Sequence, residues 1–559
     1  MAQAIAAPAP TTPPGDARRW LALMVVVSAS FMATFDQFVV NVATPAMQRD
    51  LHASFAQIQF VVAGYALTYA VTLVTGGRLG DIFGRKRLFM VGMAGFTLAS
   101  ALCGLAPGPG LLVAARLFQG LGAALMAPQV LSIIQVTFPA AERGGALSVY
   151  GAAVGLASLA GQALGGLLIR ANLFGLGWRV VFLVNIPIGV AALLAAVPLV
   201  RETRSPTARQ LDLGGVAIIT GGLFLFSFPL VAGRDAGWPA WSWACLIAAF
   251  PVLAAFVWFE RRKTIRDESP LVALDLFRQR TFAAGLGVAF PFGMANPAMF
   301  FTLALYLQIG LQFSPLAAGL TFAPAPVGFF LAATFSARLA RVLGRRLVLI
   351  AILMKAGAWT AIGLLVIRDG ASLHGLALAP LMLIEGAGAG WTSPPLIGLS
   401  LAGVTGRDAG AAAGVFTTAQ QIAGALGVAL IGVVFFGALA GQAPGIAADL
   451  APGLRARLAS ALPDSAVSAT VADFQRCVAD RASSRDPAEP PASCQVATLR
   501  TADPAIAPAI GDTLQRANAL SYAHAHAIAL FCCVGTLILA SLASLTFPAP
   551  TPERPVGLD

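Results

Sequence analysis

The sequence predicts an all-α protein that crosses a membrane many times. Of its 559 residues, 58% are hydrophobic and only 11% are charged, whereas about a quarter of the residues in a soluble domain are charged. Apolar runs recur along the chain, each long enough to form a helix that crosses a hydrocarbon core of ~30 Å. Short segments rich in arginine separate many of these runs. Together these observations exclude an ordinary soluble domain.

We expect fourteen membrane-spanning helices from the apolar runs. Because most of the joins are short, consecutive helices should be antiparallel neighbours whose backbone polar groups pair within each helix. The expected spans are 20–44, 55–76, 88–106, 111–136, 146–169, 179–200, 212–232, 240–259, 282–309, 315–337, 347–367, 373–397, 411–437 and 523–547.

The arginines and lysines predict the orientation of these helices. With both termini in the cytoplasm, the short outer loops hold few cations, among them Arg49, Arg170 and Arg368, and most of the others face the cytoplasm. This arrangement follows the positive-inside rule. It also accounts for the net charge of +11, so the charge does not indicate a nucleic-acid partner. Abundant Ala, Arg and Gly are typical of a GC-rich bacterial genome. The expected location is therefore a bacterial cytoplasmic (inner) membrane, with the lipid bilayer as partner.

Three segments lie outside the predicted spans. Residues 1–19 are rich in Ala, Pro and Thr and are expected to form a disordered cytosolic tail, and residues 549–559 form a second cytosolic tail. The first apolar run is too long for a signal-peptide core. Residues 438–522 are polar and are expected to form a long extracytoplasmic loop. Cys477 and Cys494 lie in this loop, where a disulfide and two free thiols are both open alternatives.

A charged motif and its degenerate copy predict two related halves. Residues 77–87 (GRLGDIFGRKR) are expected to form a charged turn between two spans, in which Gly77 and Gly84 let the helix ends approach closely. Residues 337–346 repeat the spacing, with Arg341 in the position of Asp81. We therefore expect an N-terminal six-helix bundle, two inserted helices and a C-terminal six-helix bundle that contains the outer loop. Their respective ranges are 20–200, 201–280 and 281–548.

The spacing G-x-L-x-D-x-x-G-R-K in residues 77–86 resembles the signature of the major facilitator superfamily. Residues 35–45, 178–187 and 306–320 are similar to segments of its fourteen-helix drug:proton antiporter family. The resemblance implies two pseudo-symmetric halves with the substrate site between them. It also implies proton-driven export of lipophilic, often cationic, compounds. The motif residues carried over as a conformational gate are Gly77, Asp81, Gly84, Arg85 and Lys86.

One segment departs from the antiporter pattern. Residues 155–166 (GLASLAGQALGG) resemble the signature G-P-x-x-G-G of the fifth helix, but Gln162 stands where proline is expected. The missing proline removes a kink, which leaves the direction of transport less secure than the fold. Close helix packing explains the glycines equally well.

Four ionisable residues inside the spans are functional candidates, because each costs at least ~2.5 to 3.5 kcal/mol on insertion scales, and proton coupling is expected of Asp36, Arg116 and Glu385. For Asp36, burial favours the neutral acid and a nearby cation favours the carboxylate, so it is expected to couple protons or a cationic substrate; permanent pairing is the alternative. Arg116 resembles the superfamily's helix 4 arginine, which is implicated in proton transfer. The alternative is that Arg116 extends to the outer interface.

Lys355 and Glu385 are the other two candidates. They lie at equal distances from a predicted turn near residue 370, which places them at similar depth on antiparallel helices. A buried ion pair is one interpretation. The other is that Glu385 faces the central cavity as a second protonatable or cation-binding group.

Polar and aromatic residues inside the spans are candidates for the substrate cavity, since drug-like ligands suit a mostly apolar pocket with few polar contacts. Hydrogen bonding between helices and core filling are equally open for each of them. These residues are Gln162, Asn296, Trp359, Trp391, Gln420 and Gln421.

Other function classes find less support. No G-x-x-x-x-G-K-[ST] loop is present, so the sequence does not predict ATP-driven transport. The four histidines show no zinc-protease spacing, and no metal, cofactor or enzymatic activity is expected. His524 and His526 are interpreted as marking a wet interface. The predicted partners are protons and a lipophilic small molecule, and a periplasmic adaptor is left open. A dedicated exporter or importer of one metabolite is the main alternative; a non-transporting sensor or assembly subunit is the alternative of another class.

Overall fold

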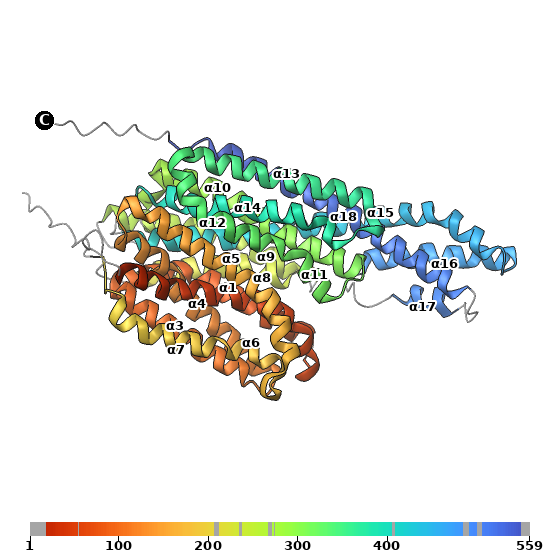
Figure 1. Cartoon of the computed structure of the whole chain (residues 1–559), viewed down its shortest axis with the longest axis horizontal. Coiled ribbons are helices and arrows are strands. Elements are labelled where there is room, and N and C mark those ends of the chain that lie inside the picture. Colours follow the sequence, from red (N-terminus) through yellow and green to blue (C-terminus); the bar gives the residue numbers. More distant parts are fainter. Residues whose placement is uncertain are drawn as a thin grey trace, which may run out of the picture.

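The computed structural model is an elongated bundle of helices that run along the long axis of the molecule (Figure 1). It describes residues 18–53, 55–205, 212–233, 237–266, 271–272, 274–404, 408–484, 491–499 and 506–548, and these contain helices and no strand. The expected all-α fold is therefore confirmed. Residues 1–17 and 549–559, where the two tails are predicted, lie outside the described part of the chain.

The N-terminal helices form one packed group. In it α4 packs on α2 and α3, and α1 packs on α5 and α7. The group consists of α1 (Arg18–Asp50), α2 (Phe55–Phe83), α3 (Arg85–Gly104), α4 (Pro109–Thr137), α5 (Ala140–Ala171), η1 (Leu173–Gly175), η2 (Gly177–Arg179), α6 (Val180–Leu183) and α7 (Asn185–Leu199).

The C-terminal helices form a second group, in which α14 packs on α12 and α13 while α18 packs on α10, α13 and α15. The two groups meet where α5 contacts α12 and α14 and where α15 contacts α2 and α4. The second group consists of η3 (Leu274–Arg278), α10 (Arg280–Leu305), the π-helix η4 (Tyr306–Gly310), α11 (Pro315–Phe322), α12 (Pro324–Leu343), α13 (Arg345–Asp369), η5 (Gly370–Ser372), α14 (Gly375–Leu401), α15 (Ala409–Leu458) and α18 (Ala507–Ser544).

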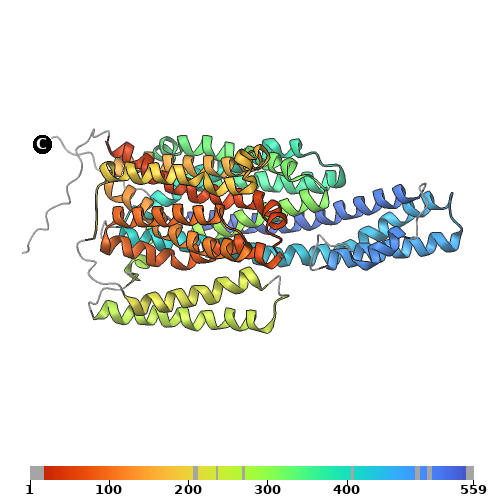
Figure 2. The same cartoon turned by 90° about the horizontal axis from the view of Figure 1, so that it is seen from below.

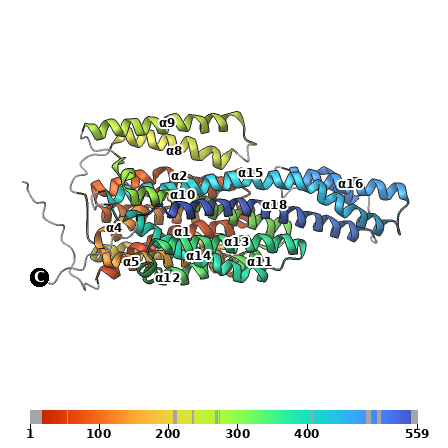
Figure 3. The same cartoon turned by 90° about the horizontal axis from the view of Figure 1, so that it is seen from above.

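Two helices that lie between these groups in the sequence form a separate hairpin. α8 (Leu213–Ala232) and α9 (Ala240–Ile265) lie side by side along the flank of the bundle (Figures 2 and 3). Leu67 and Val71 of α2 pack against Ile219 and Leu223 of α8. α9 exposes large apolar side chains such as Phe250, which is 66% exposed. Such a surface is suited to contact with lipid.

Twelve helices of the described chain are long and apolar enough to cross a membrane. α5 and α14 are not among the twelve, although they contain 32 and 27 residues. Both are rich in glycine, which lowers mean hydropathy without shortening the helix. The expected number of fourteen spans therefore stays a prediction.

The structure corrects the turn predicted at residues 77–87. α2 continues to Phe83 and α3 starts at Arg85, so Gly84 alone reverses the chain. Gly84 has a φ of 110°, a conformation that glycine adopts without the steric cost of a side chain. Most of the charged motif is therefore helical. Asp81 and Arg85 are buried inside the bundle, whereas the Arg87 side chain is 77% exposed.

The structure also corrects the polar loop expected at residues 438–522. α15 extends to Leu458, and with α16 (Asp464–Ser483), α17 (Ala492–Leu499) and the first part of α18 it forms a helical projection beyond the bundle (Figures 1 and 2). The segment is helical because apolar side chains recur at helical spacing and pack against neighbouring helices. Leu439, Ala443, Ala447 and Leu454 are all buried in the core. A Cys477–Cys494 disulfide joins α16 to α17.

Candidate functional site

The N-terminal group contains a buried ion pair between α1 and α4. Asp36 is 0% exposed and Arg116 is 1% exposed. The Arg116 Nη1 donates to Asp36 Oδ2, and its Nε donates to the carbonyl of Val61 at 2.9 Å. The alternative that Arg116 extends to the outer interface is therefore wrong, because Asp36 and the α2 backbone hold the guanidinium inside the bundle.

A polar network surrounds this pair. Gln119 Nε2 donates to Asp36 Oδ1 at 2.9 Å and to Ser100 Oγ at 2.7 Å, and Gln119 Oε1 accepts from Arg116 at 2.6 Å. Asn185 Nδ2 also donates to Ser100 Oγ, at 3.3 Å. Sequence reasoning did not select Gln119, Ser100 or Asn185 for this site. The spacing of Gln119, three residues after Arg116 on one helix face, is the signal that would have found it.

Aromatic rings enclose the same guanidinium. Arg116 lies 4.4 Å from the ring centre of Tyr65 and 5.8 Å from that of Phe182. A cation over an aromatic face is attracted by the ring quadrupole, most strongly where water is excluded. The arginine charge is thus stabilised by a carboxylate, an amide, a carbonyl and two rings.

The C-terminal group contains a second buried ion pair, between α13 and α14. Lys355 Nζ lies 2.5 Å from Glu385 Oε1 and donates to Asn296 Oδ1 of α10 at 2.7 Å. Lys355 is 0% exposed and Glu385 is 2% exposed. Trp359 and Phe292 lie 4.8 and 5.3 Å from Nζ, measured to the ring centres. Of the six predicted cavity residues, Asn296 and Trp359 thus contact Lys355 of this pair.

The other predicted cavity residues are not assembled into one pocket. Gln420 and Gln421 are partly buried on α15, and the described residues form no side-chain hydrogen bond with either. The indole Nε1 of Trp391 is buried, and no described residue forms a hydrogen bond with it. Gln162 lies on α5, but its side chain lies outside the described residues. None of the other five lines either of the two cavities described below.

The structure also corrects the interpretation of His526. This side chain is 0% exposed, with Nδ1 3.0 Å from Thr302 Oγ1 and its ring stacked on Tyr306. It therefore lies in the packed core between α18 and α10 and does not mark a wet interface. His524 is partly buried, and its Nδ1 lies 2.9 Å from the carbonyl of Leu520.

The charged motif connects the two groups at one end of the bundle. We call this end of the bundle, which contains residues 77–87 and the start of α15, the motif end. Asp81 is 0% exposed and pairs with Arg85 at 2.6 Å. It also accepts from the backbone N–H groups of Gly410 and Ala411, at 3.3 and 3.1 Å. These groups belong to the first turn of α15, where a helix dipole favours a carboxylate.

Gly77 and Lys86 complete the motif end. A Cβ at Gly77 would lie 2.3 Å from the carbonyl oxygen of Gly410, so only glycine permits this approach of α2 to α15. Lys86 Nζ donates to the Val197 carbonyl at 2.7 Å. A Cβ at Gly84 would collide with Glu202, whose carboxylate accepts from the Lys86 and Arg87 N–H groups.

Further hydrogen bonds join the groups at the motif end. Gln135 Nε2 of α4 donates to the Leu401 carbonyl of α14 at 2.7 Å. Ser148 of α5 and Ser336 of α12 exchange a hydrogen bond of 2.8 Å. The two helix groups are thus held together by polar contacts that α2, α4 and α5 make with helices of the C-terminal group.

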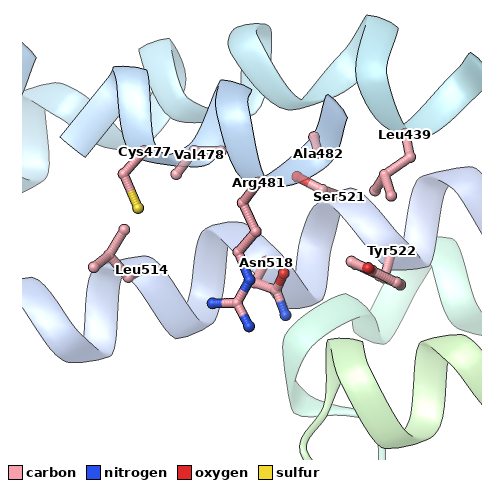
Figure 4. Close-up of a pocket in the computed structure, with 9 residues that line it drawn as sticks. All are labelled: Leu439, Cys477, Val478, Arg481, Ala482, Leu514, Asn518, Ser521 and Tyr522. Carbon is pink, nitrogen blue, oxygen red and sulfur yellow. The ribbon is translucent and has the colours of Figure 1, made fainter. Parts of the chain in front are cut away.

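Two cavities differ in size and position. One of about 250 Å³ lies at the motif end, between α4 and α5 on one side and α12 and α14 on the other. The other holds only about 10 Å³ and lies where α16 meets α15 and α18. Figure 4 shows Arg481, Asn518 and Tyr522 around it. Its volume suits a single water molecule and no larger ligand.

A bundle of long apolar helices with buried ion pairs is the arrangement expected of a protein embedded in a membrane. The chain matches the Major Facilitator Superfamily over residues 26–428. It therefore belongs to this superfamily, whose members are transporters and not enzymes. The predicted family is confirmed.

Its relatives include export and resistance proteins. The chain is 40% identical over 548 residues to the "Probable actinorhodin transporter" of Streptomyces coelicolor, covering 98% of this chain and 94% of that protein. It is 37% identical to "Puromycin resistance protein pur8" of Streptomyces alboniger, covering 76% of this chain and 83% of that protein. It is 33% identical to the "Tetracenomycin C resistance and export protein" of Streptomyces glaucescens, covering 75% and 76%.

Solved structures share the fold. The proton:xylose symporter XylE superposes with a TM-score of 0.54 at 16% identity, over 73% of this chain and 87% of that one. The human organic anion transporter MFSD10 gives a TM-score of 0.53 at 16% identity, over 76% and 94%. At this identity the similarity shows the fold alone.

Proposed function

We propose that this protein exports amphipathic, drug-like compounds across a bacterial cytoplasmic membrane and is driven by protons. The observation that carries the proposal is the pair of buried, oppositely charged couples, Asp36–Arg116 and Lys355–Glu385, one in each helix group. Charges buried at this cost are rarely retained in a membrane without a task. Relatives named for drug and antibiotic export supply the substrate class.

Each couple offers a way to convert proton binding into movement. Protonation of Asp36 or Glu385 removes the attraction that holds its partner, and the freed Arg116 or Lys355 must then find other partners. Arg116 has such partners in Gln119 and the Val61 carbonyl. A cationic substrate near either carboxylate would compete for the same charge, which links the substrate to the proton.

The motif end acts as the gate in this proposal. With both termini in the cytoplasm, the motif end faces the cytosol, and the contacts of Asp81 with α15 close it. The structure then represents a conformation sealed on the cytosolic side. Breaking the contacts of Asp81 and of Gly77 would allow the two groups to separate there, as alternating access requires.

The same proposal assigns the chain's organisation. α5 and α14 cross the membrane with the twelve helices identified by length and composition, which gives fourteen spans. Residues 20–200 and 281–548 form the two moving halves, and the inserted hairpin in 201–280 lies beside them. The helical projection lies outside the membrane on the extracytoplasmic face, where the Cys477–Cys494 disulfide would persist.

Inverted membrane vesicles test the proposal. A fluorescent lipophilic cation should accumulate in vesicles that contain the native protein when a proton gradient is imposed. Asp36→Asn and Glu385→Gln should each lower this uptake at least about tenfold, whereas the exposed Asp275→Asn should not. If uptake is independent of the gradient, or if all four proteins behave alike, the proton-coupling assignment is wrong.

A second candidate is a dedicated exporter of one antibiotic-like metabolite. The similarity to the probable actinorhodin transporter covers 98% of this chain and so includes the projection, whereas the similarity to the puromycin resistance protein covers 76%. Competition distinguishes the two candidates. A multidrug exporter should show mutual competition among unrelated cations, and a dedicated exporter should move none of them at a comparable rate.

A further inference from the structure

The larger cavity has walls from both helix groups. Gln135 and Leu147 line it from the N-terminal group, and Pro394, Pro395 and Leu399 line it from α14. Its volume of about 250 Å³ is slightly below the range of roughly 300 to 1,000 Å³ typical of pockets for drug-sized ligands. It can therefore enclose the ring system of a small aromatic compound.

Among the described residues, Arg143 is the one charged side chain that lines this cavity. Its Nε donates to the Phe138 carbonyl at 2.9 Å. Its terminal amino groups have no hydrogen bond or ion pair within the described chain. The neighbouring Glu142 does not compensate the charge, because its Oε1 pairs with Arg19 at 2.8 Å. A partly buried guanidinium therefore faces the cavity without a counter-ion.

An anionic group suits this arrangement. A guanidinium presents its donors in a planar fork that matches a carboxylate, and such charge-assisted pairs are about twice as strong as neutral hydrogen bonds. The rest of the wall is largely apolar, with leucine and proline side chains opposite one another. The cavity thus combines one cationic edge with an apolar body.

We propose that this cavity is an entry site for aromatic carboxylates, in which Arg143 binds the acid group and the apolar wall holds the ring. The inference rests on the proposed export function and refines its substrate class, since the two buried carboxylates alone favour cations. Both helix groups contribute walls, so separation of the groups at the motif end would open the site to the cytosol. A substrate bound there would already contact both halves.

Direct binding tests the site without a proton gradient. Anthracene-9-carboxylate is titrated calorimetrically into the full-length protein in zwitterionic nanodiscs, with 9-anthracenemethanol as the neutral probe. The native protein should bind the carboxylate at least about tenfold more tightly than the alcohol. Arg143→Gln should abolish this preference, and Arg143→Lys should retain part of it. Arg341→Gln is the matched control, because Arg341 is an exposed arginine on α12 near the same end.

Transport in inverted vesicles gives the second readout. Arg143→Gln should lower export of anthracene-9-carboxylate and leave export of the lipophilic cation unchanged, which also shows that the variant folds. Equal binding of the two anthracene probes by the native protein, or an unaltered preference in Arg143→Gln, overturns the proposal. So does an equal loss of both transported compounds, which would assign Arg143 a structural role. A native protein that binds the carboxylate selectively but ignores the gradient defeats the proposed function and leaves this site standing.

Discussion

The two helix groups bury similar ion pairs but support them differently. Both oxygens of Asp36 accept hydrogen bonds, from Arg116 and from Gln119. In the C-terminal group Glu385 Oε1 accepts from Lys355, while Oε2 accepts none from the described residues. Asn296 supports Lys355 and not the carboxylate. One acid is thus fixed within a network, and the other has an oxygen free to take up a proton.

This difference indicates a division of labour between the halves. Both oxygens of Asp36 already accept a hydrogen bond, whereas Oε2 of Glu385 can take up a proton without breaking one. We therefore expect Glu385 to exchange protons more readily than Asp36. The N-terminal pair, in which both carboxylate oxygens accept a hydrogen bond, should contribute more to the stability of the folded protein.

The largest expected effect comes from removing the cation of each pair. Arg116→Met leaves Asp36 buried and uncompensated and should destabilise the protein by about 3 to 5 kcal/mol. Lys355→Met should cost less, because Glu385 can be neutralised by a proton. Thermal unfolding of the two variants in the same detergent measures the difference. Equal losses would remove the contrast between the pairs.

Reversing the charges sharpens the comparison. In Lys355→Glu with Glu385→Lys the pair is retained, and the amide of Asn296 can turn to donate to the new carboxylate. Folding should be nearly native while proton-driven uptake falls strongly, because the acid now lies on α13. Asp36→Arg with Arg116→Asp should fail to fold, since Gln119, Tyr65 and the Val61 carbonyl are arranged for a guanidinium at 116. Native uptake by the α13–α14 reversal would assign that pair a purely structural role.

The charged motif and its copy provide the next comparison. Asp81→Asn removes the buried charge that binds the first turn of α15, an interaction worth up to about 2 kcal/mol in a favourable geometry. It should shift the protein toward a conformation open at the motif end. Alkylation of a cysteine introduced at the neighbouring Ala411, which is buried in the native protein, should become faster in that variant. Arg341→Gln in the copy should leave the rate unchanged, because Arg341 is exposed.

A steric substitution tests the same contact. Gly77→Ala should lower transport strongly, because its Cβ would lie 2.3 Å from the Gly410 carbonyl oxygen. Gly357→Ala on α13 meets no atom within 4 Å and should transport normally. Normal transport by both variants would show that α2 and α15 need not approach this closely during the cycle.

The smallest expected effect concerns the end opposite the motif. Hydrogen bonds from Arg179 and then Trp178 lower the pKa of Asp50 below its ordinary value of 3.8. A lowered pKa means that the native state favours the carboxylate, so this contribution is present above about pH 4 and is lost as the pH falls through the native value. Because the Asp50 side chain is 48% exposed, Asp50→Asn should cost well under ~1 kcal/mol at pH 7. Unfolding measured at pH 7 and at pH 3 should show a smaller difference between the native protein and Asp50→Asn at the lower pH.

Several features of the site could be predicted from the sequence because they are local. An ionisable residue inside an apolar run can be recognised from the sequence alone. Equal spacing from a predicted turn placed Lys355 opposite Glu385. The network around Asp36 was harder to predict, since its members Arg116, Gln119, Ser100 and Asn185 come from three other helices. The projection was missed because its polar faces lowered the hydrophobicity of residues 438–522, although its buried stripe had helical spacing.

The sequence by itself determined the membrane environment, the helical class and the superfamily. These depend on composition, on run length and on a motif in which glycine and charge stand at fixed positions. Only the tertiary structure decided that Arg116 points inward, that Asp81 caps α15, and that Arg143 faces a cavity without a counter-ion. The physical reason is that the energy of a buried charge depends on donors and acceptors brought together from helices far apart in the chain, and spacing along one helix cannot specify them.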